Sequence, residues 1–177
     1  MKYFLLKTDP QFEPMPEVID WFWRIDRRNI CPGQSHQIEN RQLFFIKGHP
    51  DTVFPDVLSF PFFMVTEKLR DVIEMYEPGT IFKEIVLLDQ AHANMGVYYL
   101  PVLEYVDCLA PASRLTRDRS MVLEAVMDAD KAGDRSIFYL GGVGNLYTVA
   151  RLDIVESFLR RGAAGIGLTE IRRASHD

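Results

Sequence analysis

Three closely spaced glycines offer the first possible chemistry. The stretch YLGGVGNLYTVA, residues 139–150, holds Gly141, Gly142 and Gly144 between two apolar runs. A dinucleotide-binding loop needs G-x-G-x-x-G at the start of a helix, and a P-loop needs a lysine and a serine or threonine after its last glycine. The third glycine of the first pattern is missing, and neither residue of the second pattern follows. The stretch therefore predicts a hairpin or bulge, with Gly144 and Asn145 suited to positive φ, and not a phosphate site.

A second set of residues could perform acid–base or nucleophilic chemistry. His92 follows Asp89 by three residues, and Cys108 lies further along at the end of an expected strand. A catalytic His–Asp pair needs a nucleophile beside it, and the sequence contains no G-x-S-x-G motif. Two hypotheses stay open: a small enzyme whose site is built around Asp89, His92 and Cys108, or an inert, buried Cys108 thiol.

Metal ligation has weaker sequence support. Cys31, His36 and Glu39 lie close together, but they match neither a CxxC nor an HExxH spacing. The two cysteines, Cys31 and Cys108, are far apart, which favours two reduced thiols over a disulfide. We therefore predict no metal site and no cofactor, and we interpret the region around His36 as a solvated loop.

An acidic stripe is the candidate for binding another molecule. Glu67, Asp71 and Glu74 recur at i, i+4 and i+7, so they share one face of an expected helix. The stripe is either an ordinary solvated face or an acidic surface that attracts a basic protein. Trp21 and Trp23 are two residues apart, which would place both rings on one face of a strand, as core residues or as interface anchors.

Two helices and several strands must position these residues. The stretch VTEKLRDVIEMYEPGT predicts a helix with Thr66 as its N-cap and Pro78-Gly79 as its stop. The stretch LDIVESFLRRG predicts a second helix. The expected apolar residues of the two helices are Leu69, Val72, Ile73 and Tyr76, and Ile154, Val155, Phe158 and Leu159.

The surroundings of the two helices repeat. A shift of 85 positions aligns them, for example Ile73 with Phe158, and a strand flanks each helix on both sides. We therefore expect an α+β fold with a mainly antiparallel sheet, two helices packed on it, and an internal strand-helix-strand duplication.

Composition limits the class of protein. The chain has 177 residues, 47% of them hydrophobic, which suffices for the core of one compact unit. Its formal net charge of −5 disfavours nucleic acid and anionic membranes as partners. The apolar run YFLL near the N-terminus is too short for the core of a signal peptide, and no run reaches the length of a membrane span. We expect a cytoplasmic protein.

From residue 60 onward the sequence resembles a bacterial family. The resemblance is carried by FFMVTEKLRDVIEMYEPGTIFKEI, then YYLPVLEYVDCLAPASRL, then DADKAGDRSIFYLGGVGNLYTVARLDIVESFLRRGAAGIGLTEI. In this order these stretches resemble the myxobacterial-type immunity proteins of polymorphic-toxin systems, formerly known only as a domain of unknown function. The second helix departs from the family pattern, because Ala150 and Arg151 stand where that pattern has a valine and a Ser/Asp/Glu cap.

The resemblance implies a function, by analogy of fold pattern alone. It covers residues 57–177, whereas residues 1–56 form an N-terminal strand and loop region that carries little of it. It implies an immunity protein that binds a cognate toxin stoichiometrically and neutralises it, without catalysis or cofactor. An acidic inhibitor would suit a basic nuclease, because phosphate-binding surfaces are basic. The alternatives are the small enzyme described above and a regulatory or scaffold domain that associates through an exposed apolar patch.

Overall fold

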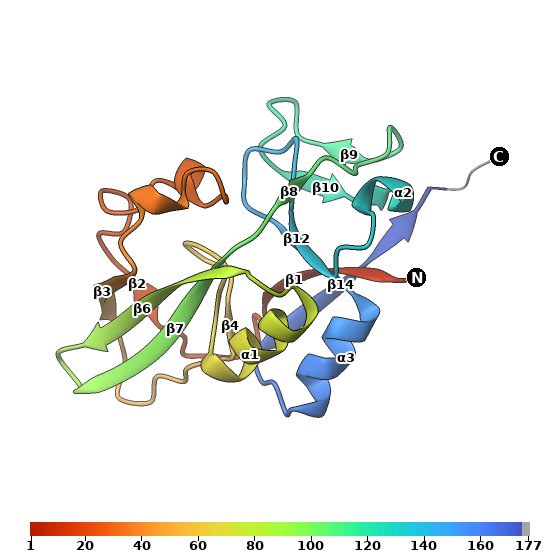
Figure 1. The fold of residues 1–177 in the computed structure, drawn as a ribbon. Coiled ribbons are helices and arrows are strands. Elements are labelled where there is room, and N and C mark those ends of the chain that lie inside the picture. The colour runs from red at the N-terminus through yellow and green to blue at the C-terminus, as the bar shows by residue number, and fades with distance from the viewer. Residues whose placement is uncertain (175–177) are drawn as a thin grey trace.

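The first of two large sheets contains the longest strands of the chain. The computed structural model describes residues 1–174 and shows an α+β fold (Figure 1). The first sheet has the strand order β2-β3-β6-β7-β5-β4. Its strands span Glu17–Val18 (β2), Arg41–Lys47 (β3), Val57–Leu58 (β4), Met64–Val65 (β5), Ile81–Asp89 (β6) and Asn94–Val102 (β7).

The second sheet is assembled from both ends of the chain. Its order is β11-β14-β1-β13-β12-β8. Its strands span Tyr3–Thr8 (β1), Tyr105–Val106 (β8), Val126–Met127 (β11), Ile137–Leu140 (β12), Thr148–Arg151 (β13) and Ile166–Arg173 (β14). A small third sheet pairs Arg114–Leu115 (β9) with Val122–Glu124 (β10). Most neighbouring strands are antiparallel, as expected, but β3–β6, β8–β12 and β11–β14 are parallel. The single sheet that we expected is therefore two large sheets.

Two helices of more than one turn pack against each other within residues 1–174. They are α1 (Glu67–Tyr76) and α3 (Leu152–Arg160), and a short α2 spans Ala129–Ala132. The apolar stripe of each helix is buried as predicted, except that Tyr76 is only partly buried and Leu159 is 50% exposed. Thr66 is the N-cap of α1, but its hydroxyl donates to Asp56 and does not cap the helix. The hydroxyl of Tyr76 ties the helices together by donating to the carbonyl of Asp153 at 3.1 Å.

The connectivity of the two sheets repeats. In the first sheet, β5, α1 and β6 follow one another, and β7 lies between the two parallel strands β5 and β6. In the second sheet, β13, α3 and β14 follow one another, and β1 lies between β13 and β14. The order β3-β6-β7-β5-β4 thus matches β11-β14-β1-β13-β12. The shift of 85 positions fits this match, because it aligns Ile81, the first residue of β6, with Ile166, the first residue of β14. We call β3-β6-β7-β5-β4 with α1 the first unit, and β11-β14-β1-β13-β12 with α3 the second unit. A common origin of the two units stays a prediction.

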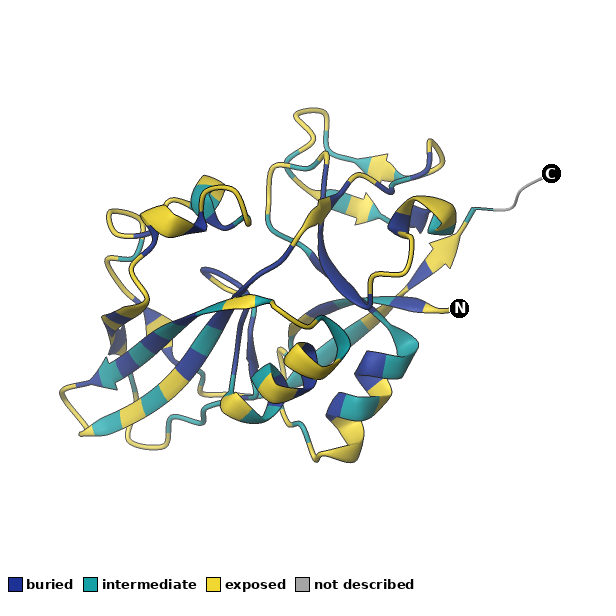
Figure 2. Ribbon diagram, viewed as in Figure 1, coloured by how far each residue is buried: buried dark blue, intermediate teal, exposed yellow. Residues whose placement is uncertain are grey.

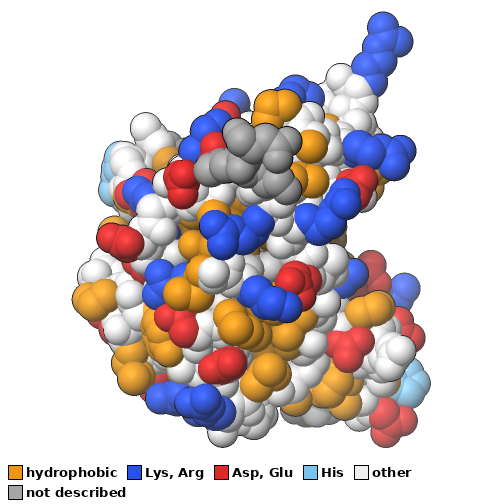
Figure 3. All heavy atoms as spheres, turned by 90° about the vertical axis from the view of Figure 1, so that its right-hand side faces the viewer, with side chains coloured by type: hydrophobic (Ala, Val, Ile, Leu, Met, Phe, Trp, Pro, Cys, Tyr) orange, Lys and Arg blue, Asp and Glu red, His pale blue; other side chains and the backbone are white. Residues whose placement is uncertain are grey.

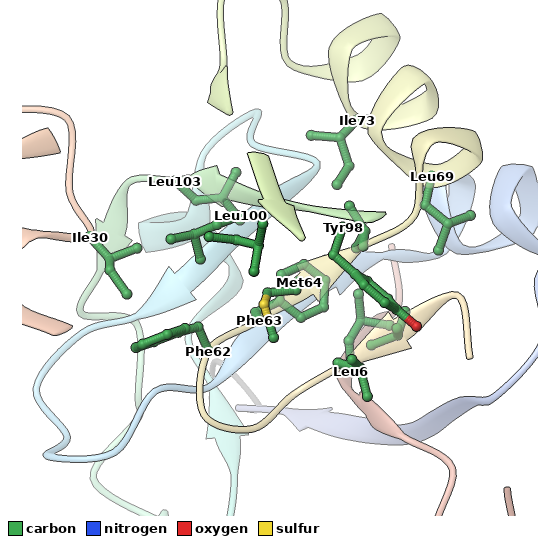
Figure 4. Close-up of a cluster of buried hydrophobic side chains, with 14 of the residues drawn as sticks. Leu6, Ile30, Phe62, Phe63, Met64, Leu69, Ile73, Tyr98, Leu100 and Leu103 are labelled. Atoms are coloured by element: carbon green, nitrogen blue, oxygen red, sulfur yellow. The ribbon is translucent and has the colours of Figure 1, made fainter. Parts of the chain in front are cut away.

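The main hydrophobic core is shared by the two units. Side chains from both sheets and from α1 meet there, and Figure 4 shows ten of them labelled, with Leu6 of β1 close to Tyr98 of β7. The hydroxyl of Tyr98 donates to the carbonyl of Pro55 at 2.7 Å, so this buried polar group is satisfied. A second, smaller core lies on the opposite face of the second sheet, around Tyr3, Phe138 and other alternate strand residues.

Residues 1–56 supply strands to both sheets. β1 is central in the second sheet, and β3 pairs with β6 in the first. The prediction that the stretch around Trp21 and Trp23 forms a strand is wrong, since the strand ends at Val18. Asp20 has φ +56°, which interrupts extended backbone and starts a turn. Trp21 packs edge-to-face on Phe62 beside the main core, whereas Trp23 is 82% exposed.

Within residues 1–174 there is no helix with the length and apolar character that crossing a membrane requires.

Candidate functional site

The glycine-rich stretch forms a hairpin loop, as predicted. β12 and β13 pair antiparallel on either side of it. The positive φ occurs at Gly142, at +73°, and not at Gly144 or Asn145. A Cβ on Gly141 would lie 2.9 Å from the backbone nitrogen of Asp107, so a close approach of two backbones explains this glycine. The glycines therefore serve the packing of the loop.

Asp89 and His92 lie together at the turn between β6 and β7. The Asp89 side chain is buried, and its Oδ2 accepts a hydrogen bond from Nδ1 of His92 at 2.7 Å. Its Oδ1 accepts from the backbone amides of Ala91 and His92 at 3.1 and 3.3 Å. Burial alone would raise the pKa of Asp89, but these hydrogen bonds together lower it. The pair fixes the turn.

Cys108 lies apart from this pair. It belongs to the second core, against the second sheet, whereas Asp89 and His92 lie at one end of the first sheet (Figure 1). Burial raises the pKa of the Cys108 thiol to about 11, which keeps it protonated near neutral pH. The geometry therefore gives no support to a site composed of Asp89, His92 and Cys108.

The Asp89 interactions lead to a prediction about pH. A carboxyl group whose pKa is lower in the folded chain stabilises it above the unfolded value of 3.8, and this stabilisation is lost as the pH falls through the folded pKa. The free energy of unfolding of Asp89→Asn should therefore fall less than that of the parent chain between pH 6 and pH 3. This range brackets the pKa of free aspartate, which is about 4. Urea unfolding at several pH values measures this. Parallel profiles for the two chains would contradict the assignment.

Among residues 1–174, the cysteines and histidines do not gather into a metal site. Cys31 and Cys108 are both free thiols. In the part of the chain that the structure describes, no group of three or more His, Cys, Asp and Glu side chains is arranged to hold a metal ion. His36 is exposed in a short 3₁₀ segment, Ser35–Gln37, in the loop before β3.

The acidic stripe of α1 lies on the surface. Glu67, Asp71 and Glu74 are all exposed on the side of α1 opposite its buried residues. Arg70 partly neutralises the stripe through ion pairs with Glu67 at 3.1 Å and Asp71 at 2.7 Å. Elsewhere the charges are mixed: the face drawn in Figure 3 carries Lys, Arg, Asp and Glu among hydrophobic areas. The predicted geometry of the stripe is thus confirmed, and its role stays a prediction.

The first sheet has an uncovered apolar face that the sequence analysis missed. Two cross-strand rows of side chains form it, one from Leu43 through Val86 to Val97, the other from Phe45 to Met95. Leu88 lies between Phe45 and Met95. We call the six side chains of these two rows the outer face. Met95 is 61% exposed, Phe45 42%, Leu43 40% and Val97 39%. Figure 2 shows the resulting bands of buried and less buried residues along β6 and β7.

The equivalent face of the second sheet is covered. The alignment by 85 positions matches Val86 of the outer face with Ile171, which is only 4% exposed. Ile171 and its cross-strand partner Tyr3 belong to the second core. The segment between β8 and β12 covers that core with Cys108 and Ala132, among others. One unit thus buries this face under its own chain, and the other leaves it open.

Arg70 joins the acidic stripe to the outer side of the first sheet. Its guanidinium carbon lies 4.4 Å from the centre of the Tyr99 ring, in cation–π geometry. Tyr99 lies on β7 two residues beyond Val97, on the same side of the sheet. The apolar face and the acidic stripe are therefore parts of one continuous surface, and this surface is the candidate functional site.

No protein-family model matches the chain, and no curated protein matches it.

Proposed function

We propose that this chain is an immunity protein that binds a cognate bacterial toxin one to one, in the cytoplasm of the producing cell, and blocks it. The observation that carries the proposal is the outer face. Four of its six apolar side chains are at least 39% exposed, and the six lie in two rows across the neighbouring strands β3, β6 and β7. Contiguous apolar surface of this kind marks protein interaction sites. The resemblance to immunity proteins supplies the kind of partner, and the acidic stripe suits a basic one such as a nuclease.

Two other functions have less support. A small enzyme at Asp89, His92 and Cys108 lacks a shared site, because Cys108 belongs to the second core and the other two form a turn. A regulatory or scaffold domain would also use an exposed apolar patch, but it would bind copies of itself or a larger assembly. Gel filtration separates this alternative from a one-to-one inhibitor.

The test uses the product of the reading frame adjacent to the gene for this chain. Toxin activity should fall linearly with added chain and vanish at one equivalent, and calorimetric titration should give a stoichiometry of one. Once binding has reached equilibrium, the inhibition should not deepen with further incubation, because one molecule of the chain inactivates only one molecule of toxin. Inactivation by far less than one equivalent would show turnover and would contradict the proposal, as would the absence of a complex.

The acidic stripe gives a second prediction. Replacing Glu67, Asp71 and Glu74 together by lysine should slow association with a basic toxin by about tenfold or more at low salt, since charge complementarity acts mainly on the association rate. Stopped-flow fluorescence or surface plasmon resonance measures the rate.

A matched control makes the same charge change elsewhere. In this control, lysine replaces three exposed acidic residues of the second unit, which are Asp134, Glu156 and Glu170. This variant should keep most of the association rate. Equal rates for the stripe variant and the control would remove the stripe from the binding surface.

A further inference from the structure

The repeat of the fold provides an internal comparison for the outer face. Both units have the same strand order, and the second unit covers its equivalent face with apolar side chains of the segment between β8 and β12. That cover contributes Cys108 and Ala132, which are both fully buried. The first unit has apolar residues at the corresponding positions without such a cover. The comparison shows what chemistry this kind of face accepts: a close-packed apolar layer.

Charges at one border of the outer face indicate the sign of its partner. Arg41, the first residue of β3, forms an ion pair at 2.6 Å with Glu84, its cross-strand partner within β6. Beyond Tyr99, the helix α1 adds Arg70 with the exposed Glu67 and Asp71. Carboxylates exceed guanidinium groups along this border once Glu74 of the stripe is included. A partner whose rim carries Lys or Arg gains attraction there.

The outer face is held rigidly. β6 and β7 are nine-residue strands that pair without interruption from Ile81 opposite Val102 to Asp89 opposite Asn94. Binding therefore costs little ordering of backbone, which favours tight association. A second copy of the chain fits the charges less well, because both copies carry a formal net charge of −5.

We infer that the outer face is the toxin-binding surface, and that it takes a toxin surface with an apolar centre and a Lys/Arg rim; the inference rests on the proposed function. Phe45 and Met95 lie in the second of its two cross-strand rows, with Leu88 between them. They fill the centre of the interface together with Leu88, and the acidic stripe of α1 orients the basic rim. Burying a lysine at this centre would leave an unpaired charge without water, so the face is sensitive to single charges.

The experiment compares the affinities of two double variants for the candidate toxin. This toxin is the protein encoded by the adjacent reading frame, and an inactive variant of it is used. Phe45→Lys with Met95→Lys should weaken binding by about 100-fold or more, as expected for hot-spot residues. Met121→Lys with Leu159→Lys is the control, because these side chains are 48% and 50% exposed outside the outer face. It makes the same charge change and should bind within about threefold of the parent chain. Circular dichroism and thermal unfolding establish that each variant is folded, and Met95→Lys alone repeats the test with a smaller change.

Each outcome has one interpretation. Weakened binding by the outer-face variant alone supports the inference. Unchanged binding by both variants overturns it, and leaves the proposed function intact. A parent chain that binds no toxin overturns the proposed function itself. A parent dimer that the outer-face lysines convert to a monomer, with toxin binding unchanged, assigns the face to self-association and also overturns the inference.

Discussion

Phe158→Ala should lower the free energy of unfolding by about 3–5 kcal/mol, the cost typical of removing a buried aromatic ring. Phe158 is fully buried in the main core, on the buried side of α3 that it shares with Ile154 and Val155. Truncation leaves a cavity between elements of both units, which cannot collapse without moving a helix. Urea unfolding followed by circular dichroism measures the loss. Because small domains are stable by about 5–15 kcal/mol, the variant should remain folded but be visibly weakened.

The neighbouring residue is the matched control. Leu159→Ala changes the next position of the same helix, where the side chain is 50% exposed. Its effect should stay within about 0.5 kcal/mol, as for most surface substitutions. Equal losses for the two variants would contradict the placement of Phe158 in the core.

Gly48→Ala should destabilise the chain by about 3 kcal/mol, through steric overlap and lost hydrogen bonds. A Cβ at this position would lie 1.9 Å from Oδ2 of Asp89, and that oxygen accepts the hydrogen bond from His92. Asp89 is buried, so its carboxylate cannot swing into solvent without breaking the β6–β7 turn. Thermal or urea unfolding measures the change.

Gly33→Ala serves as its control. No atom lies within 4 Å of a Cβ built on Gly33, and its φ is not in the positive range. The substitution should be neutral, or stabilising by up to about 1 kcal/mol through the unfolded chain. A tolerated Gly48→Ala would mean that Asp89 is free to move, and would undermine its assigned role in the turn.

Local patterns in the sequence predicted the helices and their surfaces. The spacing of Leu69, Val72 and Ile73 predicted the buried side of α1, and the carboxylates of the stripe lie on its exposed side. The glycine-rich stretch predicted a hairpin, which β12 and β13 form. These predictions hold because hydrophobic periodicity and glycine conformation act within a few residues.

Features that depend on distant pairing were beyond the sequence. β1 pairs with β13 and β14 from the other end of the chain, and no local pattern announces that arrangement. The strand expected around Trp21 is interrupted at Asp20, which adopts positive φ although it is not a glycine. Asp89 and His92 are near in sequence and in contact, but the place of Cys108 depended on the tertiary fold.

The outer face had a sequence signal that was open to another interpretation. The strands RQLFFIK and IFKEIVLLD are apolar at consecutive as well as alternate positions. Such strands are typical of sheets buried on both faces. Within residues 1–174 the chain covers one face of these strands, with residues such as Ile25 and Ile30 in the main core, and leaves the other open. The apolar pattern of these strands thus indicated that both faces become covered, and we infer that the toxin covers the outer face.

The measurement closest to the central claim is hydroxyl-radical footprinting of the free chain and of its complex with the toxin. Met95 on the outer face is 61% exposed and Met121 outside it 48% exposed, so both methionines should oxidise readily in the free chain. We expect the complex to protect Met95 several-fold and to leave Met121 as reactive as before. A complex in which Met95 oxidises at its free rate would contradict the claim that this chain acts by covering a toxin with the outer face of its first sheet.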